Sequence, residues 1–138
     1  MRMERLTTKS HEALRAAVDL AARRGNPELV PEHLLVAILG QEGGVGRALV
    51  ERAGARPQAL ASDLDERLAG LPKVSGGAEP GFGRRFSPFL QKAEDEAKRL
   101  KDDYVSVEHF LLAGAKHDKD VQAAFDRHAL SYDKLVRA

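Results

Sequence analysis

The chain contains no cysteine among its 138 residues. This absence excludes a disulfide scaffold, a thiolate metal site and a cysteine nucleophile. Long apolar runs are also missing: the longest, residues 34–39, has six residues, far short of the roughly 20 that a membrane-spanning helix requires. The charged N-terminal residues 1–6 do not resemble a secretory signal. We therefore expect a soluble, cytoplasmic protein without a membrane partner.

An excess of charge of one sign is lacking as well, because 22 Lys and Arg residues face 21 Asp and Glu residues. A polyphosphate ligand normally calls for a clear positive excess, so we expect no nucleic-acid partner. The pairs Arg23-Arg24 and Arg84-Arg85 support a helical nucleic-acid-binding domain as the least favoured alternative. We interpret both pairs as solvated surface. Base-stacking platforms are not expected either, because four phenylalanines fall at inward helix positions: Phe86, Phe89, Phe110 and Phe125.

Residues that favour strands are scarce: isoleucine occurs once and aromatic residues make up 5% of the chain, whereas alanine and leucine are its two most frequent residue types. This composition predicts an all-α fold without a sheet. Residues 71–85 contain four glycines and two prolines, which no helix accommodates. We expect a mobile Gly/Pro-rich linker there, between a first helical half at 6–70 and a second at 86–138.

The two halves resemble each other in sequence. When residues 14–60 are laid over residues 90–136 without gaps, twelve positions are identical, including Glu32-His33 over Glu108-His109. Each half alone is too small to bury a stable core. We therefore predict eight helices, arranged as two four-helix repeats that pack about a pseudo-twofold axis into a single domain over 1–138 and place Leu35 and Leu111 in equivalent environments.

Capping signals place the helix ends. In the first half, Thr7 or Thr8 begins a helix that ends at Gly25, Pro31 opens a buried helix, the third covers about 45–53, and Pro57 opens the fourth. In the second half, Ser87 caps and Pro88 starts a helix whose buried stripe runs to Leu100. Glu94/Lys98 and Asp95/Arg99 are expected to face water as i,i+4 ion pairs. The remaining predicted caps are Ser106 before a helix at 110–115, Asp118 or Asp120, and Ser131.

The sequence carries no motif for catalysis or for nucleotide binding. There is no Gly-x-Ser-x-Gly elbow, and the glycine-dense residues 40–46 lack the lysine and serine of a phosphate-binding loop. The adjacent Glu and His of each repeated pair point about 100° apart on a helix, which does not suit a zinc site. We expect neither an enzyme nor a cofactor or metal in this chain. Each glutamate instead suits the first turn of a buried helix, near the positive end of its dipole.

What remains is surface that can bind other polypeptides. Two helical repeats around a pseudo-twofold axis leave a seam between them, with an apolar floor and helix N-termini at its rim. On these grounds alone the chain is a helical, adaptor-like interaction domain.

Several motifs together resemble the paired Clp repeats that form the N-terminal domain of Clp ATPases. They are Arg5-Leu6-Thr7, Gln41-Glu42-Gly43-Gly44, the run from Val30 to Leu35 and its partner from Val105 to Leu111. The opening residues 1–7 and the linker start at 71–74 are more similar to ClpB-type disaggregases than to the ClpA and ClpC branches. The resemblance covers essentially the whole chain.

The resemblance implies a monomeric, noncatalytic domain that precedes two AAA+ ATPase modules, which use ATP and Mg²⁺, assemble as a hexamer and thread aggregated protein through a pore. Its expected partners are unfolded or aggregated protein clients in this stress-response chaperone family. Adaptor proteins are possible partners in addition, because docking of a folded adaptor, as in ClpA and ClpC relatives, is the alternative function. Because the ATPase modules are absent here, we interpret the chain as an excised domain.

The family's client groove, carried over position by position, implies three substrate-binding residues: Thr7 at the Leu-Thr opening, Asp102 in the loop before Tyr104, and Glu108 in the second Glu-His pair. Each has a purely structural alternative. Thr7 can serve only as a helix cap, Asp102 can belong to a solvated turn, and Glu108 can interact only with its helix dipole.

Overall fold

The computed structural model describes residues 2–77 and 79–138. Within these residues the chain forms eight α-helices, one short 3-10 helix at Met3–Arg5 and two strands of two residues each. The helices are α1 (Thr8–Arg24), α2 (Pro31–Leu39), α3 (Val45–Arg52), α4 (Pro57–Ala69), α5 (Phe86–Arg99), α6 (Val107–His117), α7 (Lys119–Arg127) and α8 (Tyr132–Arg137). The strands are β1 (Glu28–Leu29) and β2 (Gly81–Phe82). No helix in the described part of the chain is long and apolar enough to cross a membrane.

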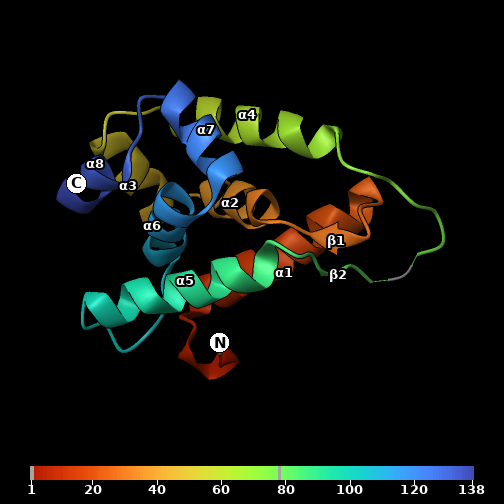
Figure 1. Cartoon of the computed structure of the whole chain (residues 1–138), viewed down its shortest axis with the longest axis horizontal. Helices are drawn as coiled ribbons and strands as arrows, with labels where there is room; N and C mark the ends of the chain where they lie inside the picture. The colour runs from red at the N-terminus through yellow and green to blue at the C-terminus, as the bar shows by residue number, and fades with distance from the viewer. Residues whose placement is uncertain (1, 78) are drawn as a thin grey trace.

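The helices lie in three layers, with α2 and α6 in the middle (Figure 1). Helices α1 and α5 cover one side of this central pair, α4 and α7 cover the other, and α3 and α8 lie together at one end. The central position of α2 and α6 follows from their sequences, which are apolar on nearly every face and therefore cannot border solvent. Their fully or nearly fully buried apolar side chains include Leu34, Leu35, Ile38, Leu39, Phe110, Leu111 and Leu112.

The all-α fold of two related quartets is confirmed. Leu35 in α2 and Leu111 in α6 are both 0% exposed and belong to one core. The packing around α6 is close at Gly114, where a Cβ atom would lie 2.8 Å from the side chain of Val121 in α7 and 3.4 Å from that of Leu35. A larger residue at Gly114 would therefore push α7 away from the core.

The prediction of no sheet was wrong in one detail. β1 pairs with β2 in parallel, and Leu6 forms an isolated parallel bridge with Val105. The alignment of the two halves, extended to their starts, places Leu29 over Val105 and Leu6 over Phe82, so the two pairings are equivalent. In each, the extended segment before the first helix of one half pairs with the segment before the second helix of the other half. These exchanges satisfy backbone groups that would otherwise be buried without partners.

The linker is attached to the domain at both ends, which sequence reasoning did not anticipate. At its start, the Val74 amide donates to the Gly25 carbonyl at 2.8 Å, and the Asn26 side chain donates to the Pro72 carbonyl at 3.1 Å. At its end, the Gly83 amide donates to the Leu29 carbonyl at 2.9 Å. As predicted, the described part of 71–85 contains no helix. Residue 78 of this linker lies outside the described residues.

Most of the predicted caps are confirmed. Thr7, Asp118 and Ser131 accept hydrogen bonds from the backbone of the first turn, Ser106 is the N-cap of α6 and donates its amide to His109, and Gly25 ends α1 in the left-handed conformation. Three other details were wrong. α5 begins at Phe86, before the predicted Ser87 cap, because the chain leaves β2 through a turn at Gly83. Leu100 follows α5 as its C-cap and is 40% exposed. Arg99 binds Glu96 rather than Asp95, and Glu94 and Lys98 form no ion pair.

Candidate functional site

A groove of about 300 Å³ lies where the starts of α1, α3 and α6 meet. We call it the Glu108 groove. The polar groups on its walls come from the starts of α1 and α6 and from the loop after α2, and its apolar contacts come from two valines. Its lining residues are Thr7, Thr8, Lys9, Gln41, Val45, Ser106, Val107 and Glu108. The structure therefore brings two of the three predicted site residues, Thr7 and Glu108, to one groove.

Thr7 is held in place by the exchange between the two halves. Its backbone amide donates to the Val105 carbonyl at 3.1 Å, and its Oγ1 accepts from the Ser10 amide at 3.1 Å. Ser10 in turn donates from Oγ to the same Val105 carbonyl at 2.9 Å. Gln41 closes the neighbouring wall, because its Nε2 donates to the Lys9 carbonyl at 3.0 Å. The start of α1 is thus a rigid wall of the groove.

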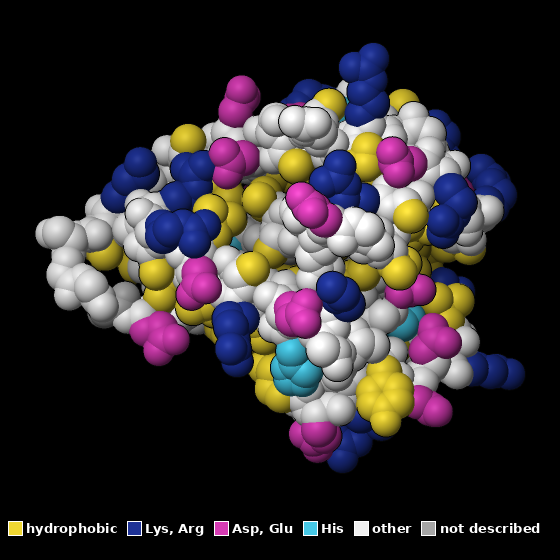
Figure 2. Space-filling view, turned by 180° about the vertical axis from the view of Figure 1, so that it is seen from behind, with side chains coloured by type: hydrophobic (Ala, Val, Ile, Leu, Met, Phe, Trp, Pro, Cys, Tyr) yellow, Lys and Arg dark blue, Asp and Glu magenta, His cyan; other side chains and the backbone are white. Residues whose placement is uncertain are grey.

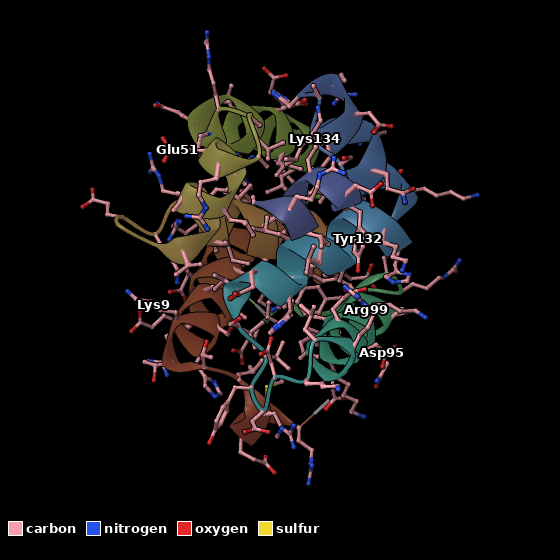
Figure 3. All side chains as sticks on the ribbon, turned by 90° about the vertical axis from the view of Figure 1, so that its left-hand side faces the viewer. Lys9, Glu51, Asp95, Arg99, Tyr132 and Lys134 are labelled. Atoms are coloured by element: carbon pink, nitrogen blue, oxygen red, sulfur yellow. The ribbon has the colours of Figure 1, made fainter. Side chains whose placement is uncertain are left out.

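Glu108 lies in the first turn of α6, half-buried, and its only recorded partner among the described residues is the hydroxyl of Ser106. The amide of Ser106 donates to Nδ1 of His109 at 2.9 Å. Lys9, which lies across the groove, pairs with Glu12 at 3.4 Å instead of with Glu108. Figure 3 shows Lys9 on the outer side of α1. Glu108 therefore presents a carboxylate without a cationic partner to the groove.

Asp102 does not line this groove. Its Oδ2 lies 2.8 Å from Nε2 of His109, whose other ring nitrogen accepts from Ser106. The Asp102 side chain is 50% exposed, whereas that of His109 is 1% exposed. Asp102 therefore contacts the groove only through His109, and it orients the ring that holds the first turn of α6.

The groove continues along an apolar hollow of about 170 Å³. The two share Val45 and Glu108, and the hollow runs between α3, α6 and α8. Three large apolar side chains on it are exposed to solvent: Val45 at 54%, Val136 at 46% and Leu100 at 40%. The remaining lining residues are Leu49, Arg52, Leu112, Leu135 and Ala138. Exposed apolar side chains that gather along one track are typical of a surface that binds another chain.

Sequence reasoning missed the apolar part of this site. Val45 and Val136 lie on short helices whose exposed faces could not be distinguished from buried ones without the tertiary packing. Leu100 was assigned to the buried stripe of α5, but the chain turns away at this residue. One signal was present at Val45, which follows the glycine-rich turn at Gly43-Gly44 and therefore lies in the first turn of α3.

The equivalent carboxylate of the first half, Glu32, has different surroundings. Its Oε1 accepts from Arg85 Nη2 at 2.9 Å, and its side chain is 5% exposed. Burial raises the pKa of Glu32, while the nearby Arg85 charge acts in the opposite direction. Arg85 also donates two hydrogen bonds to Asp118, at 2.9 and 3.1 Å, and lies 3.4 Å from Asp120. The interpretation of Arg85 as solvated surface was therefore wrong.

The two repeated histidines also differ in their partners. His33 accepts from the Val30 amide at Nδ1, as His109 does from Ser106, but its Nε2 lies 3.0 Å from the amide oxygen of Asn26 instead of a carboxylate. Burial lowers the pKa of His33 to about 4. Within the described residues, no group of three or more His, Asp or Glu side chains is arranged to hold a metal ion. Both histidines therefore bind a backbone amide at the start of their own helix.

Comparison with known sequences shows relatives of one kind. The sequence profile of the family described as "Clp repeat (R) N-terminal domain" matches residues 5–127. The chain is 38% identical over 131 residues to the chaperone protein ClpB of Corynebacterium diphtheriae, a match that covers 94% of this chain and 15% of that protein. It is 43% identical over 115 residues to the ClpB of Nitratidesulfovibrio vulgaris, covering 80% of this chain and 13% of the relative. The chain thus spans about one seventh of the length of these relatives.

Solved structures show the same fold. The N-terminal domain of Hsp104 from Candida albicans superposes with a TM-score of 0.81 at 24% identity, over 94% of this chain and 85% of that one. A complex of the ClpV N-domain with a VipB peptide superposes with a TM-score of 0.75 at 20% identity, over 96% and 82% of the two chains.

Proposed function

This chain belongs to the family of Clp repeat N-terminal domains, and on that premise we propose that it is the noncatalytic client-binding domain of a ClpB-like AAA+ chaperone. Its clients are unfolded or aggregated polypeptides, which it binds through the Glu108 groove. In this proposal the domain passes them to ATPase modules outside the chain, where ATP and Mg²⁺ drive disaggregation in the cytoplasm. The parent protein is a hexamer, and this domain alone is a monomer.

The observation that supports this proposal is the open apolar track beside Glu108. An unfolded segment differs from a folded protein in that it exposes apolar side chains together with unpaired backbone N–H and C=O groups. Val45 and the hollow beyond it offer apolar contact, Thr7 offers a hydroxyl, and the Glu108 carboxylate can accept from a backbone N–H. Asp102 contributes by holding His109 and thereby the first turn of α6.

These contacts require no particular client sequence. The groove and its hollow are small compared with a standard stable interface, so binding is expected to be weak and broadly selective. Weak binding suits a domain that must release its client to a motor.

Docking of an adaptor is the second candidate function. It is favoured by the ClpV N-domain, which shares this fold and has been solved in complex with a peptide of a named protein, VipB. An adaptor would bind through one defined sequence, whereas a client groove should accept many. The nucleic-acid alternative is weakened, because one arginine of each pair is already bound: Arg24 to Asp65 at 2.6 Å and Arg85 to Glu32 at 2.9 Å. In addition, side chains of both charges alternate over the face in Figure 2.

The proposal is tested by a charge placed on the exposed apolar track. We expect Val45→Asp to weaken binding of a permanently unfolded, fluorescently labelled protein at least about tenfold, because a carboxylate must then be desolvated against apolar client surface. Val45 is 54% exposed, so the variant should unfold at the same denaturant concentration as the parent.

Val74→Asp is the matched control, since Val74 is a similarly exposed valine, at 57%, in the linker. It should bind like the parent protein. Equal affinities for Val45→Asp and the parent would reject the groove. If scrambling the sequence of an apolar ligand peptide abolished binding, adaptor docking would replace client binding.

A further inference from the structure

A second cavity, of about 340 Å³, lies at the start of α5. We call it the Lys92 cavity. Its floor is apolar, since Phe89 is 3% exposed and Ala113 is 0% exposed. Its rim carries cationic side chains from the end of the linker and from α5, together with His117 at the end of α6. The lining residues are Arg84, Arg85, Pro88, Phe89, Lys92, Ala113, His117 and Asp118.

This cavity is the pseudo-twofold equivalent of the region around the start of α1. In the alignment of the two halves, the positions that line it fall on Thr8, Lys9, Glu12, Ala13, Ala16, Ala37, Gln41 and Glu42. Three of these eight positions, those of Thr8, Lys9 and Gln41, line the Glu108 groove. The α1 set carries one cation and two carboxylates, whereas the Lys92 cavity carries three cations and one carboxylate. Equivalent places in the fold therefore differ in the sign of their charge.

The acidic groups near the Lys92 cavity already have partners. Asp118 accepts from Arg85 and also from the Val121 amide at 3.0 Å, and Glu32 and Asp120 both pair with Arg85. Arg85 is therefore neutralised from within the domain. In the described residues, neither Arg84 nor Lys92 forms an ion pair, and both are exposed.

The pKa of His117 reflects the same positive surroundings. Burial lowers the pKa of His117, and the charge of Lys92 lowers it further. Glu96, whose carboxylate lies 3.7 Å from His117, is already hydrogen-bonded by Tyr132 at 2.7 Å and Arg99 at 3.2 Å. Among the described residues, the ion pairs at this end of α5 are therefore made by Arg85, and neither Arg84 nor Lys92 has a carboxylate within ion-pair distance.

We propose that the Lys92 cavity is a second protein-binding site, which takes an acidic segment of a partner polypeptide. An apolar side chain of that segment enters against Phe89 and Ala113, and neighbouring carboxylates lie between Arg84 and Lys92. This charge preference separates the cavity from the Glu108 groove, whose free charge is a carboxylate and which therefore disfavours acidic segments.

The test uses two short synthetic peptides, one in which Glu alternates with Leu between Gly and Ser spacers, and one in which Lys replaces every Glu. In an NMR titration of the intact chain, the Glu peptide should shift the amide signals of Arg84, Lys92 and His117. The Lys peptide should leave them unchanged. Lys92→Glu should weaken the Glu peptide about tenfold or more, because like charges then face each other. Added salt should also weaken it.

Lys98→Glu provides the matched control, because it makes the same charge change on the same helix at an exposed residue outside the cavity. It should bind the Glu peptide like the parent chain, and Val45→Asp should do so too. The proposal fails if Lys92→Glu and Lys98→Glu weaken binding equally, or if the shifts map to the Glu108 groove. It also fails if a short oligonucleotide gives the same shifts, since the cavity would then be a general anion site.

Discussion

Glu32 and Glu108 occupy equivalent positions in the two halves, yet one is enclosed and the other is open. Glu32 is covered by Arg85, whereas Glu108 has no ion pair among the described residues, because the residue equivalent to Arg85, Lys9, pairs with Glu12 in solvent. The duplicated fold therefore has two equivalent surfaces at the starts of α2 and α6. The Glu32–Arg85 ion pair covers the carboxylate on the first of them and leaves only that of Glu108 open. The open side has the apolar track, and the enclosed side has the acidic residues that hold Arg85.

The largest expected effect comes from breaking the enclosed side. Arg85→Ala leaves Glu32 and Asp118 without their common cation. We expect the free energy of unfolding to fall by about 3 kcal/mol, measured by urea denaturation, because a buried carboxylate without a partner is costly. Lys9→Ala, the equivalent change on the open side, should cost no more than about 0.5 kcal/mol. Similar losses in the two variants would contradict the difference between the halves.

An effect of similar size, but confined to acidic pH, concerns the histidine of the enclosed half. The pKa of His33 lies at about 4 in the folded chain, below its ordinary value near 6.5. The unfolded chain therefore binds an extra proton between these values, so stability is complete above about pH 6.5 and declines as the pH falls toward 4. We expect wild type to lose about 3 kcal/mol more than His33→Gln between about pH 7 and pH 4. Parallel pH profiles would show that His33 is not held neutral.

The fourth helices of the two halves differ too. α4 has 13 residues and buries three leucines, whereas α8 has six and buries only Leu135. The short helix is anchored by Tyr132, which donates to the buried Glu96 at 2.7 Å, and Figure 3 shows it beside Arg99. Tyr132→Phe should cost about 1 kcal/mol in thermal or urea unfolding. Tyr104→Phe, at a residue that is 57% exposed, should leave the free energy of unfolding unchanged. A loss of stability in Tyr104→Phe but not in Tyr132→Phe would contradict the anchoring of α8 by Tyr132.

The smallest effect is expected at the ends of α1 and α5. Gly25 has a φ of 73°, and its equivalent Lys101 has a φ of 62°, a left-handed conformation that costs energy for a residue with a Cβ atom. Lys101→Gly should therefore raise the melting temperature slightly, by the equivalent of about 0.5–1 kcal/mol. Gly25→Ala should lower it, because a Cβ atom there would also lie 3.1 Å from the Val74 carbonyl. If Lys101→Gly lowered stability, the two helix ends would not be equivalent.

The architecture was readable from sequence because it depends on local signals that repeat. Thr7, Gly25, Ser106 and Asp118 each mark a helix end through their own side chain or backbone preference, and one constant offset aligns the halves. The crossed pairings were not predictable. Leu6 with Val105 and β1 with β2 are pairings of only one and two residue pairs between segments far apart in the chain, and only the packed halves bring them together.

The site was predictable only in part, for a similar reason. Thr7 and Glu108 were named through the family resemblance, whose motifs are local, and their role in client binding stays a prediction. Arg85 looked like solvated surface because its three acidic partners lie at Glu32, Asp118 and Asp120, on two other elements of the fold. Whether a charged side chain is free or neutralised depends on its tertiary neighbours, and the numbers of acidic and basic residues in the sequence do not reveal those neighbours.

The central claim is that an unfolded chain without carboxylate side chains binds only to the Glu108 side of the duplicated fold. The most direct measurement is an NMR titration of the isotope-labelled chain with an apolar, permanently unfolded peptide that lacks carboxylate side chains. We predict shifts at Thr7, Val45 and Glu108, with none at Glu32 and Arg85. Equal shifts on both sides, or shifts at Glu32 and Arg85 alone, would contradict the account.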